Sequence, residues 1–229
     1  MATQVIRFHK QAPKALAPVT TIKAARAIAG SLGEPSKMPG RAYGLPTRLC
    51  RAGGKLRAKT NSTCSKCYAR KGRYVFRNVT DAQEKRAAGL RHPQWSEAMV
   101  LLILRANCEW FRWHDSGDLQ GLWHLILIVA IARELPWINF WLPTREIGMV
   151  RQYLAQHGEF PKNLCVRISA HWVDDLIAPQ AECTSVVRSK EDWILPGTWK
   201  CPAPQQNGKC GDCRACWDRS VARVSYKQH

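Results

Sequence analysis

Apolar and polar positions in the middle of the chain follow two alternating periods. Apolar runs of strand length occupy residues 111–115, 138–142 and 164–169. Apolar stretches of helical length, 122–135 and 147–156, lie between them. Strands that alternate with helices at this spacing form βαβ units, so the sequence predicts an α/β fold with a parallel sheet. The pattern suits either an open sheet or a partial (β/α) barrel.

Helical patterns also precede the first predicted strand. They cover residues 21–32, 81–90 and 95–104, and Gly33 is the expected stop of the first helix. Residues 35–63 are rich in Pro, Gly and basic residues, which indicates an irregular loop with at most a short strand. Residues 176–200 show no clear element.

These patterns divide the chain into two parts. Residues 1–34 are predicted to form a basic N-terminal arm and helix, with residues 1–20 partly disordered. Residues 35–229 are predicted to form a single α/β domain, on which the Cys-rich tail at 201–217 packs back. With 229 residues, 45% of them hydrophobic, the chain can bury a substantial core.

Polar and ionisable residues follow each of the three predicted strands. They are His114, Asp115 and Asp118 after the first, Thr144, Arg145 and Glu146 after the second, and Ser169 and His171 after the third. Parallel sheets and barrels place their sites at this carboxyl edge, so we expect one shared site. The alternative is that these are ordinary loop residues and helix caps; Asp118, for example, could cap the helix that follows it.

Catalytic roles in this site are assigned to His114, Asp115, Asp118, Arg145 and His171, and cofactor contacts to Tyr68 and Ser169. Imidazole with a carboxylate partner suits proton transfer near neutral pH. A guanidinium suits recognition of a carboxylate or phosphate.

Ten cysteines offer a second kind of chemistry. We expect no signal peptide, because the first forty residues carry no apolar block that ends in a small-residue cleavage site. We expect no transmembrane helix either, because the longest apolar run, 122–132, is short and contains His124. We therefore expect a protein of a reducing compartment, where clustered cysteines are more often metal ligands or catalytic than disulfide-bonded. Three others, Cys108, Cys165 and Cys183, stand alone and are interpreted as small buried hydrophobes.

The tail cysteines Cys201, Cys210, Cys213 and Cys216 have the spacing C-x8-C-x2-C-x2-C. Two overlapping C-x2-C steps on one tight loop are typical of a [4Fe–4S] cluster, with a more remote Cys as the fourth ligand. Zinc also takes four thiolates, but its sites usually pair two separated C-x2-C knuckles. Gly208 and Gly211 would ease the backbone around the metal.

The second group is Cys64 and Cys67, with Cys50 upstream. Two arrangements remain open. Either Cys64 and Cys67 join the tail cysteines at one shared site, or Cys50, Cys64 and Cys67 hold a cluster with one open iron while the tail holds another. The alternative is a disulfide or a zinc site that only stabilises the structure and takes no part in a reaction.

Charge is distributed unevenly along the chain. Residues 1–86 hold 19 Lys and Arg against three acidic residues, whereas residues 87–229 hold 16 against 14. A one-sided excess of this size is the electrostatic footprint of a protein that binds a polyanion, usually nucleic acid. The alternative is a solvated basic surface that keeps the protein dispersed.

Several motifs resemble a bacteriophage family called gene product 88, over roughly residues 35–229. They are GLP at 44–46, CSKCYARKGRY at 64–74, FRWHDSGDL at 111–119, FWLPTRE at 140–146 and KCGDCRACW at 209–217. The resemblance implies phage origin, and hence the cytoplasm of a host cell, rather than an activity. A looser similarity to radical S-adenosylmethionine proteins lies in the Cys67-Tyr68-Ala69 step followed by strand–helix units; it implies a [4Fe–4S] cluster and S-adenosylmethionine as cofactor.

Three functions follow. The first is an iron–sulfur enzyme of the radical S-adenosylmethionine type, in which the tail cluster is auxiliary. The second is a nucleic-acid-binding protein with a structural or redox-sensing iron–sulfur or zinc site, in which some of the ten Trp stack on bases. The third, which ranks last, is a nuclease with Asp115, Asp118 and Glu146 around a divalent metal ion.

Overall fold

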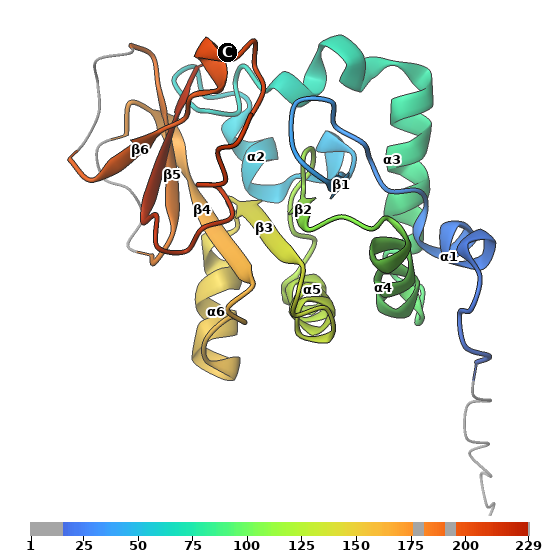
Figure 1. The fold of residues 1–229 in the computed structure, drawn as a ribbon. Helices are drawn as coiled ribbons and strands as arrows, with labels where there is room; N and C mark the ends of the chain where they lie inside the picture. Colours follow the sequence, from blue (N-terminus) through green and yellow to red (C-terminus); the bar gives the residue numbers. More distant parts are fainter. Residues whose placement is uncertain (1–15, 176–180, 191–195, 229) are drawn as a thin grey trace, which may run out of the picture.

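The computed structural model describes residues 16–175, 181–190 and 196–228 (Figure 1). Its strands are β1 (Arg41–Tyr43), β2 (Trp110–Trp113), β3 (Asn139–Thr144), β4 (Leu164–Val173), β5 (Thr184–Arg188), β6 (Thr198–Lys200) and β7 (Arg223–Lys227). Its α-helices are α1 (Ile22–Ala29), α2 (Arg51–Leu56), α3 (Arg77–Gly89), α4 (Trp95–Arg105), α5 (Leu122–Glu134) and α6 (Ile147–His157). Short 3₁₀ turns cover Thr47–Leu49, Tyr68–Arg70, Gly72–Val75 and Ala203–Gln205.

The strands form one seven-stranded sheet in the order β1-β2-β3-β4-β5-β7-β6, and every pairing in it is parallel. The predicted α/β class with a parallel sheet is therefore confirmed. The three predicted strands are β2, β3 and β4, and the helices expected between them are α5 and α6. Helices α4, α5 and α6 lie in a row along one side of the sheet (Figure 1).

The expectation that residues 176–200 hold no element is wrong, because β5 and β6 lie there. Both strands are short, and neither shows a clear alternation of apolar and polar residues. They exist because they pair with neighbours: β5 with β4 and β7, and β6 with β7. Residues 1–15, where disorder was expected, and residues 176–180 and 191–195 lie outside the described part of the chain.

The helix-covered face of the sheet carries the main hydrophobic core. Phe111, Trp113, Phe140 and Leu142 are fully buried there against the helices. The aromatic rings of Phe111 and Trp113 meet edge to face at 5.0 Å, and Trp113 stacks on Phe140 at 6.2 Å. These residues alternate along β2 and β3 with residues of the opposite face, as the two-residue period of a strand requires.

The opposite face of β2 and β3 is covered by the Cys-rich tail. Trp110 and Trp141 pack there against Trp217, with ring centroids 5.8 and 5.1 Å apart. The indole N–H of Trp217 donates to the carbonyl of Phe111 at 2.9 Å, which ties the tail to the sheet. Both faces of the sheet are thus buried, as in most parallel sheets.

Helix α1, within the predicted basic arm, packs against α3 and α4. The Thr21 hydroxyl caps it by accepting from the amide of Ala24 at 3.1 Å, and Gly30 ends it with a φ of +76°. Ala25 and Ala29 are fully buried, and the hydroxyl of Tyr43 donates to the carbonyl of Ala29 at 2.6 Å. Among the described residues, no helix has the length and apolarity needed to cross a bilayer.

Candidate functional site

Helix α2 and the loop after it lie across the carboxyl ends of β3 and β4. The amide of Ala52 donates to the Glu146 carboxylate at 2.7 Å, just after β3. The amide of Thr63 donates to the carbonyl of His171 at 2.9 Å, near the end of β4. The segment that carries the upstream cysteines is therefore fastened to the edge where parallel sheets hold their sites.

Three thiols converge at this edge; we call Cys50, Cys64 and Cys67 the front thiols. The pKa of Cys50 is raised to about 12, mainly by burial and in smaller part by the proximity of Asp118, Cys67 and Cys64. Burial also raises the pKa of Cys64, against the influence of Arg145. In the described part of the chain, the cysteines that influence Cys50 and Cys64 are other front thiols, and no tail cysteine is among them.

Gly53 makes room for this convergence. A Cβ atom at position 53 would lie 3.2 Å from the Cβ of Cys50 and 3.3 Å from the Sγ of Cys64. Contacts this close would push the two cysteines aside. The first turn of α2 is therefore shaped around the thiols.

Asp118 holds the first two strand ends together. Its buried carboxylate accepts from the Leu119 amide at 2.8 Å, the Thr144 hydroxyl at 2.6 Å and the Arg145 amide at 3.0 Å. Burial raises its pKa, although the three donors oppose that shift. The alternative that Asp118 caps the following helix is wrong, because α5 begins at Leu122 and Asp118 bonds none of its amides.

Arg145 and His171 complete this half of the edge. The Nε of Arg145 donates to the Thr63 hydroxyl at 3.0 Å. The Nε2 of His171 lies 3.2 Å from the Arg145 carbonyl, which can only accept, so Nε2 carries a proton. The structure thus brings together Asp118, Arg145 and His171, as expected from their places after three successive strands.

Asp115 and Tyr68 form the other half. The Asp115 carbonyl accepts from the Tyr68 hydroxyl at 2.6 Å, and its carboxylate accepts from the Tyr74 hydroxyl at 3.2 Å. The Tyr68 hydroxyl in turn accepts from Arg112 at 2.9 Å. The guanidinium of Arg112 stacks on the Trp141 ring at 4.3 Å. Tyr68 is therefore held beside Cys67 by a half-buried arginine, Arg112.

His114 and Ser169 are not part of this gathering. The His114 ring is buried and faces His124 in the core, with ring centroids 5.4 Å apart, and its backbone has a φ of +53°. Both ring nitrogens of His114 lack a partner within the described residues, and burial lowers the pKa of His114 well below its usual value. The Ser169 hydroxyl instead accepts from Ser185 on β5 at 3.1 Å.

The tail cysteines, Cys201, Cys210, Cys213 and Cys216, form the second group. Burial raises the pKa of Cys201 and Cys210, and Cys213 adds to both shifts by proximity. Cys216 is buried, with a pKa raised to about 12 by burial, and its Sγ lies 3.1 Å from the Tyr226 hydroxyl. Gly208 and Gly211 have φ of +75° and +53°, so they supply the left-handed turns of this loop.

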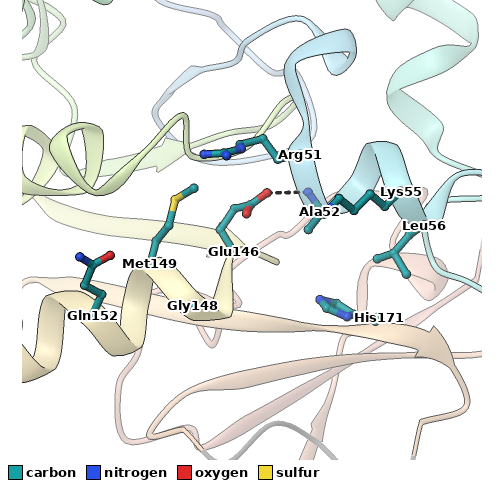
Figure 2. A pocket seen from close by; sticks show the side chains of 9 residues that line it. All are labelled: Arg51, Ala52, Lys55, Leu56, Glu146, Gly148, Met149, Gln152 and His171. Atoms are coloured by element: carbon teal, nitrogen blue, oxygen red, sulfur yellow. Dashed lines mark hydrogen bonds between the residues drawn. The ribbon is translucent and has the colours of Figure 1, made fainter.

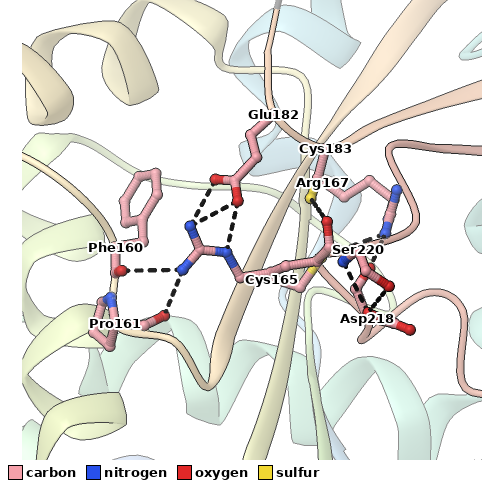
Figure 3. Close-up of polar contacts among 9 residues, drawn as sticks. Phe160, Pro161, Cys165, Arg167, Glu182, Cys183, Asp218 and Ser220 are labelled. Carbon is pink, nitrogen blue, oxygen red and sulfur yellow. Dashed lines mark hydrogen bonds and ion pairs between the residues drawn. The ribbon is translucent and has the colours of Figure 1, made fainter.

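A buried arginine fastens this tail to the sheet. Arg167 on β4 donates to five carbonyls; those of Ala215, Asp218 and Val221 lie at 3.0 Å, Thr184 at 2.9 Å and Cys216 at 3.4 Å. Cys165 and Cys183 were interpreted as isolated. The Cys183 thiol donates to the carbonyl of Arg219 at 3.6 Å (Figure 3), and the Cys165 sulfur accepts from Arg167 at 3.4 Å. Both are buried, as expected, whereas Cys108 is half-buried.

All ten cysteines are free thiols. Within the described residues, no group of three or more His, Cys, Asp or Glu side chains has an arrangement that could hold a metal ion. That holds for the front thiols and the tail thiols as they stand here, and also for Asp115, Asp118 and Glu146, so the carboxylate triad expected of a nuclease does not form. Asp118 bonds three donors and Glu146 the amide of Ala52.

Several residues of the site escaped sequence reasoning. Thr63, Tyr74, Arg112 and Arg167 make its polar contacts, and nothing in the local pattern marks them as partners. Arg112 and Arg167 lie inside strands, where a charged residue in an apolar run is a signal of a buried polar contact. Tyr74 lies within the distinctive stretch 64–74.

The comparisons with known proteins add one finding. A family profile described as gene product 88 matches residues 9–219, which include the front thiols, the strand ends and the tail thiols. The match begins earlier than the expected residue 35 and ends before residue 229. No curated protein and no solved structure matches the chain, so the similarity to radical S-adenosylmethionine proteins finds no support there. On the length of that match, the chain belongs to the gene product 88 family.

Proposed function

We propose that this protein is an iron–sulfur protein with two clusters, one on the front thiols and one on the tail thiols. The observation that supports the proposal is that Cys50 and Cys64 lie against Gly53, with Cys67 close enough to influence both thiols, at the carboxyl edge of a parallel sheet. Three protein thiolates on a [4Fe–4S] cluster leave one iron without a protein ligand. The front cluster is thus proposed as the reactive one.

The tail group fits a cluster with four protein ligands. Its three closely spaced cysteines match the local spacing of [4Fe–4S] ligands, and Cys201 is the remote fourth. A zinc ion draws all four sulfurs to about 2.3 Å from one point. A cubane instead bonds each sulfur to a different iron, so its thiols stand farther apart.

The site residues have separate tasks in this proposal. An iron that lacks a protein ligand can bind a cofactor such as S-adenosylmethionine and supply it with an electron. Arg145 offers a positive charge beside the thiols for a carboxylate or phosphate. His171 holds a proton on Nε2, and its Nδ1 is available to accept one. Asp118 keeps the backbone of Arg145 in place.

The test is an anaerobic reconstitution with iron and sulfide. We expect about eight iron and eight sulfide per chain and a broad absorption band near ~400 nm. The C64A/C67A variant should keep about half of the iron, and C108A, which changes a half-buried cysteine outside both groups, should keep all of it. Zinc, or iron without sulfide, would refute the proposal. Formation of 5′-deoxyadenosine tests the radical S-adenosylmethionine type; none formed with intact clusters rejects that type alone.

A second candidate function, nucleic-acid binding, has its own supporting observation. The segment from α2 to the start of α3 exposes a run of basic side chains: Arg51, Lys55, Lys59, Lys66, Arg70, Lys71, Arg73 and Arg77. Phe76 in the same segment is 57% exposed. Basic residues interleaved with exposed aromatic rings suit a single-stranded polynucleotide.

Titration of a single-stranded oligonucleotide at several salt concentrations tests this candidate. We expect affinity to fall steeply with salt, and K71Q/R73Q to reduce the slope of log K against log salt by about 1.4. R133Q, on α5, is the matched control and should leave the slope unchanged. No binding at low salt would remove this candidate.

A further inference from the structure

A cavity of about 700 Å³ lies between α2 and the start of α6. Arg51 and Lys55 of α2 line it, and Met149 and Gln152 of α6 lie across from them, with His171 of β4 at one end. Figure 2 shows Glu146 between Met149 and Ala52, where its carboxylate accepts the Ala52 amide at 2.7 Å. The volume falls within the range of small-molecule sites, about 300–1,000 Å³.

The cavity borders the front thiols. Cys50 directly precedes Arg51 of its wall. Thr63, whose amide donates to the carbonyl of His171, directly precedes Cys64. The chain thus runs directly from Cys50 into the wall of the cavity, although none of the described cysteines lines the cavity itself.

The two cationic side chains that line the cavity are not paired with other described residues. Arg51 and Lys55 are one helical turn apart, so their side chains are neighbours on α2. Neither has a hydrogen-bond or ion-pair partner in the part of the chain that the structure describes. Arg48, three residues before Arg51 in the chain, does have such a partner, because its guanidinium donates to the Glu84 carboxylate at 2.9 Å. Among the described residues that line the cavity, Glu146 is the only acidic one.

We propose that this cavity binds a small ligand that joins a polyphosphate to an apolar or aromatic part, as a nucleoside triphosphate does. Two adjacent cations suit several negative charges, and arginine forks onto phosphate oxygens. Leu56 and Met149 offer an apolar surface for the other part. The binding of this ligand depends on the cavity alone. The further step, that the ligand is a substrate of the site at the front thiols, rests on the proposed function.

The probe is ATP, titrated by calorimetry into the full chain at constant ionic strength. We expect adenosine and pyrophosphate each to bind at least about tenfold more weakly than ATP, because each lacks one half of the ligand. The R51Q/K55Q variant should lose about tenfold or more in affinity, since it removes two charge-assisted contacts. The control K59Q/K85Q removes the same charge from exposed residues outside the cavity and should change affinity less than about twofold.

A change at Glu146 should have the opposite effect on the affinity for ATP. E146Q keeps an oxygen that can accept the Ala52 amide but removes the negative charge, so ATP should bind several-fold more tightly. Equal losses in R51Q/K55Q and K59Q/K85Q would show attraction by net charge alone and overturn the inference, as would no binding of ATP. Iron and sulfide counts on the same samples separate this outcome from a failure of the iron–sulfur proposal.

Discussion

The two groups of thiols lie in different surroundings. The front thiols lie at the carboxyl edge of the sheet, beside Asp118 and Arg145, and a cavity begins at Arg51, the residue after Cys50. The tail thiols lie over a sheet face, under a loop that Trp217 and Arg167 fasten. Thiols beside charged groups and a cavity can meet a substrate, whereas thiols packed against tryptophans are suited to holding a structure together. Under the proposed function, the front thiols therefore serve the chemistry and the tail thiols serve stability.

The largest expected effect comes from Arg167, which belongs to the tail. R167M keeps the buried stem but leaves five carbonyls without their donor. Each unsatisfied buried group costs about 1–3 kcal/mol, so we expect the free energy of unfolding to fall by more than about 3 kcal/mol in urea titrations. R133M, an exposed arginine on α5, should change it by less than about 0.5 kcal/mol. A small effect of R167M would contradict the view that the tail is part of the folded core.

The core under the front edge should respond to acid. Burial lowers the pKa of His124 from 6.5 to about 3. Between these two pH values the unfolded chain binds a proton at His124 and the folded chain does not. The contribution of His124 to the free energy of unfolding is therefore complete above pH 6.5 and is lost as the pH falls toward 3. Between pH 7 and pH 5 the loss is about 2 kcal/mol.

The H124F variant tests this by urea unfolding at the two pH values. The difference in unfolding free energy between pH 7 and pH 5 should shrink by about 2 kcal/mol relative to the unchanged protein. H92F replaces an exposed histidine and should leave that difference unaltered. An unchanged difference in H124F would mean that His124 is protonated in the folded protein.

The fold was largely readable from the sequence because three buried strands and their helices have strong local periods. Strands β5, β6 and β7 were not, since their residues are strand-forming only when a neighbour completes their hydrogen bonds. β4 was expected to end at residue 169 but continues to Val173, where it meets the loop after α2. Contacts between distant segments, not local pattern, decide such elements.

The site divides in the same way. Position after a strand predicted that Asp118, Arg145 and His171 share an edge, because parallel strands end together. The same rule failed to place His114 there: its backbone turns at a φ of +53°, and the ring enters the core. The sequence also offered no reason to place Arg51 and Lys55 at a binding site, because the cavity that they line forms only in the folded chain. Spacing along the chain does not reveal which helix covers which edge.

Iron release sharpens the contrast between the two groups of thiols. An open cavity beside the front thiols admits a chelator, whereas the tail must open locally first. Reconstituted protein should therefore release iron to a chelator in two phases that differ at least about tenfold in rate, equivalent to about 1.4 kcal/mol in barrier. C67S should remove the fast phase and C213S the slow one; both replace half-buried cysteines. A single phase in the unchanged protein would erase the distinction.

The smallest expected effect concerns the link between the two regions. Arg112 donates to Tyr68, which follows Cys67, and stacks on Trp141, which packs against Trp217 after Cys216. R112K keeps the charge but loses the planar stacking, which is worth about 0.5–2 kcal/mol. We therefore expect a loss of about 1 kcal/mol in unfolding free energy. A double-mutant cycle of R112K with Y68F separates the Arg112–Tyr68 contact from the stacking on Trp141. If the two changes in unfolding free energy simply add, the front and the tail are energetically separate. A coupling energy above about 0.5 kcal/mol means that they act as one unit.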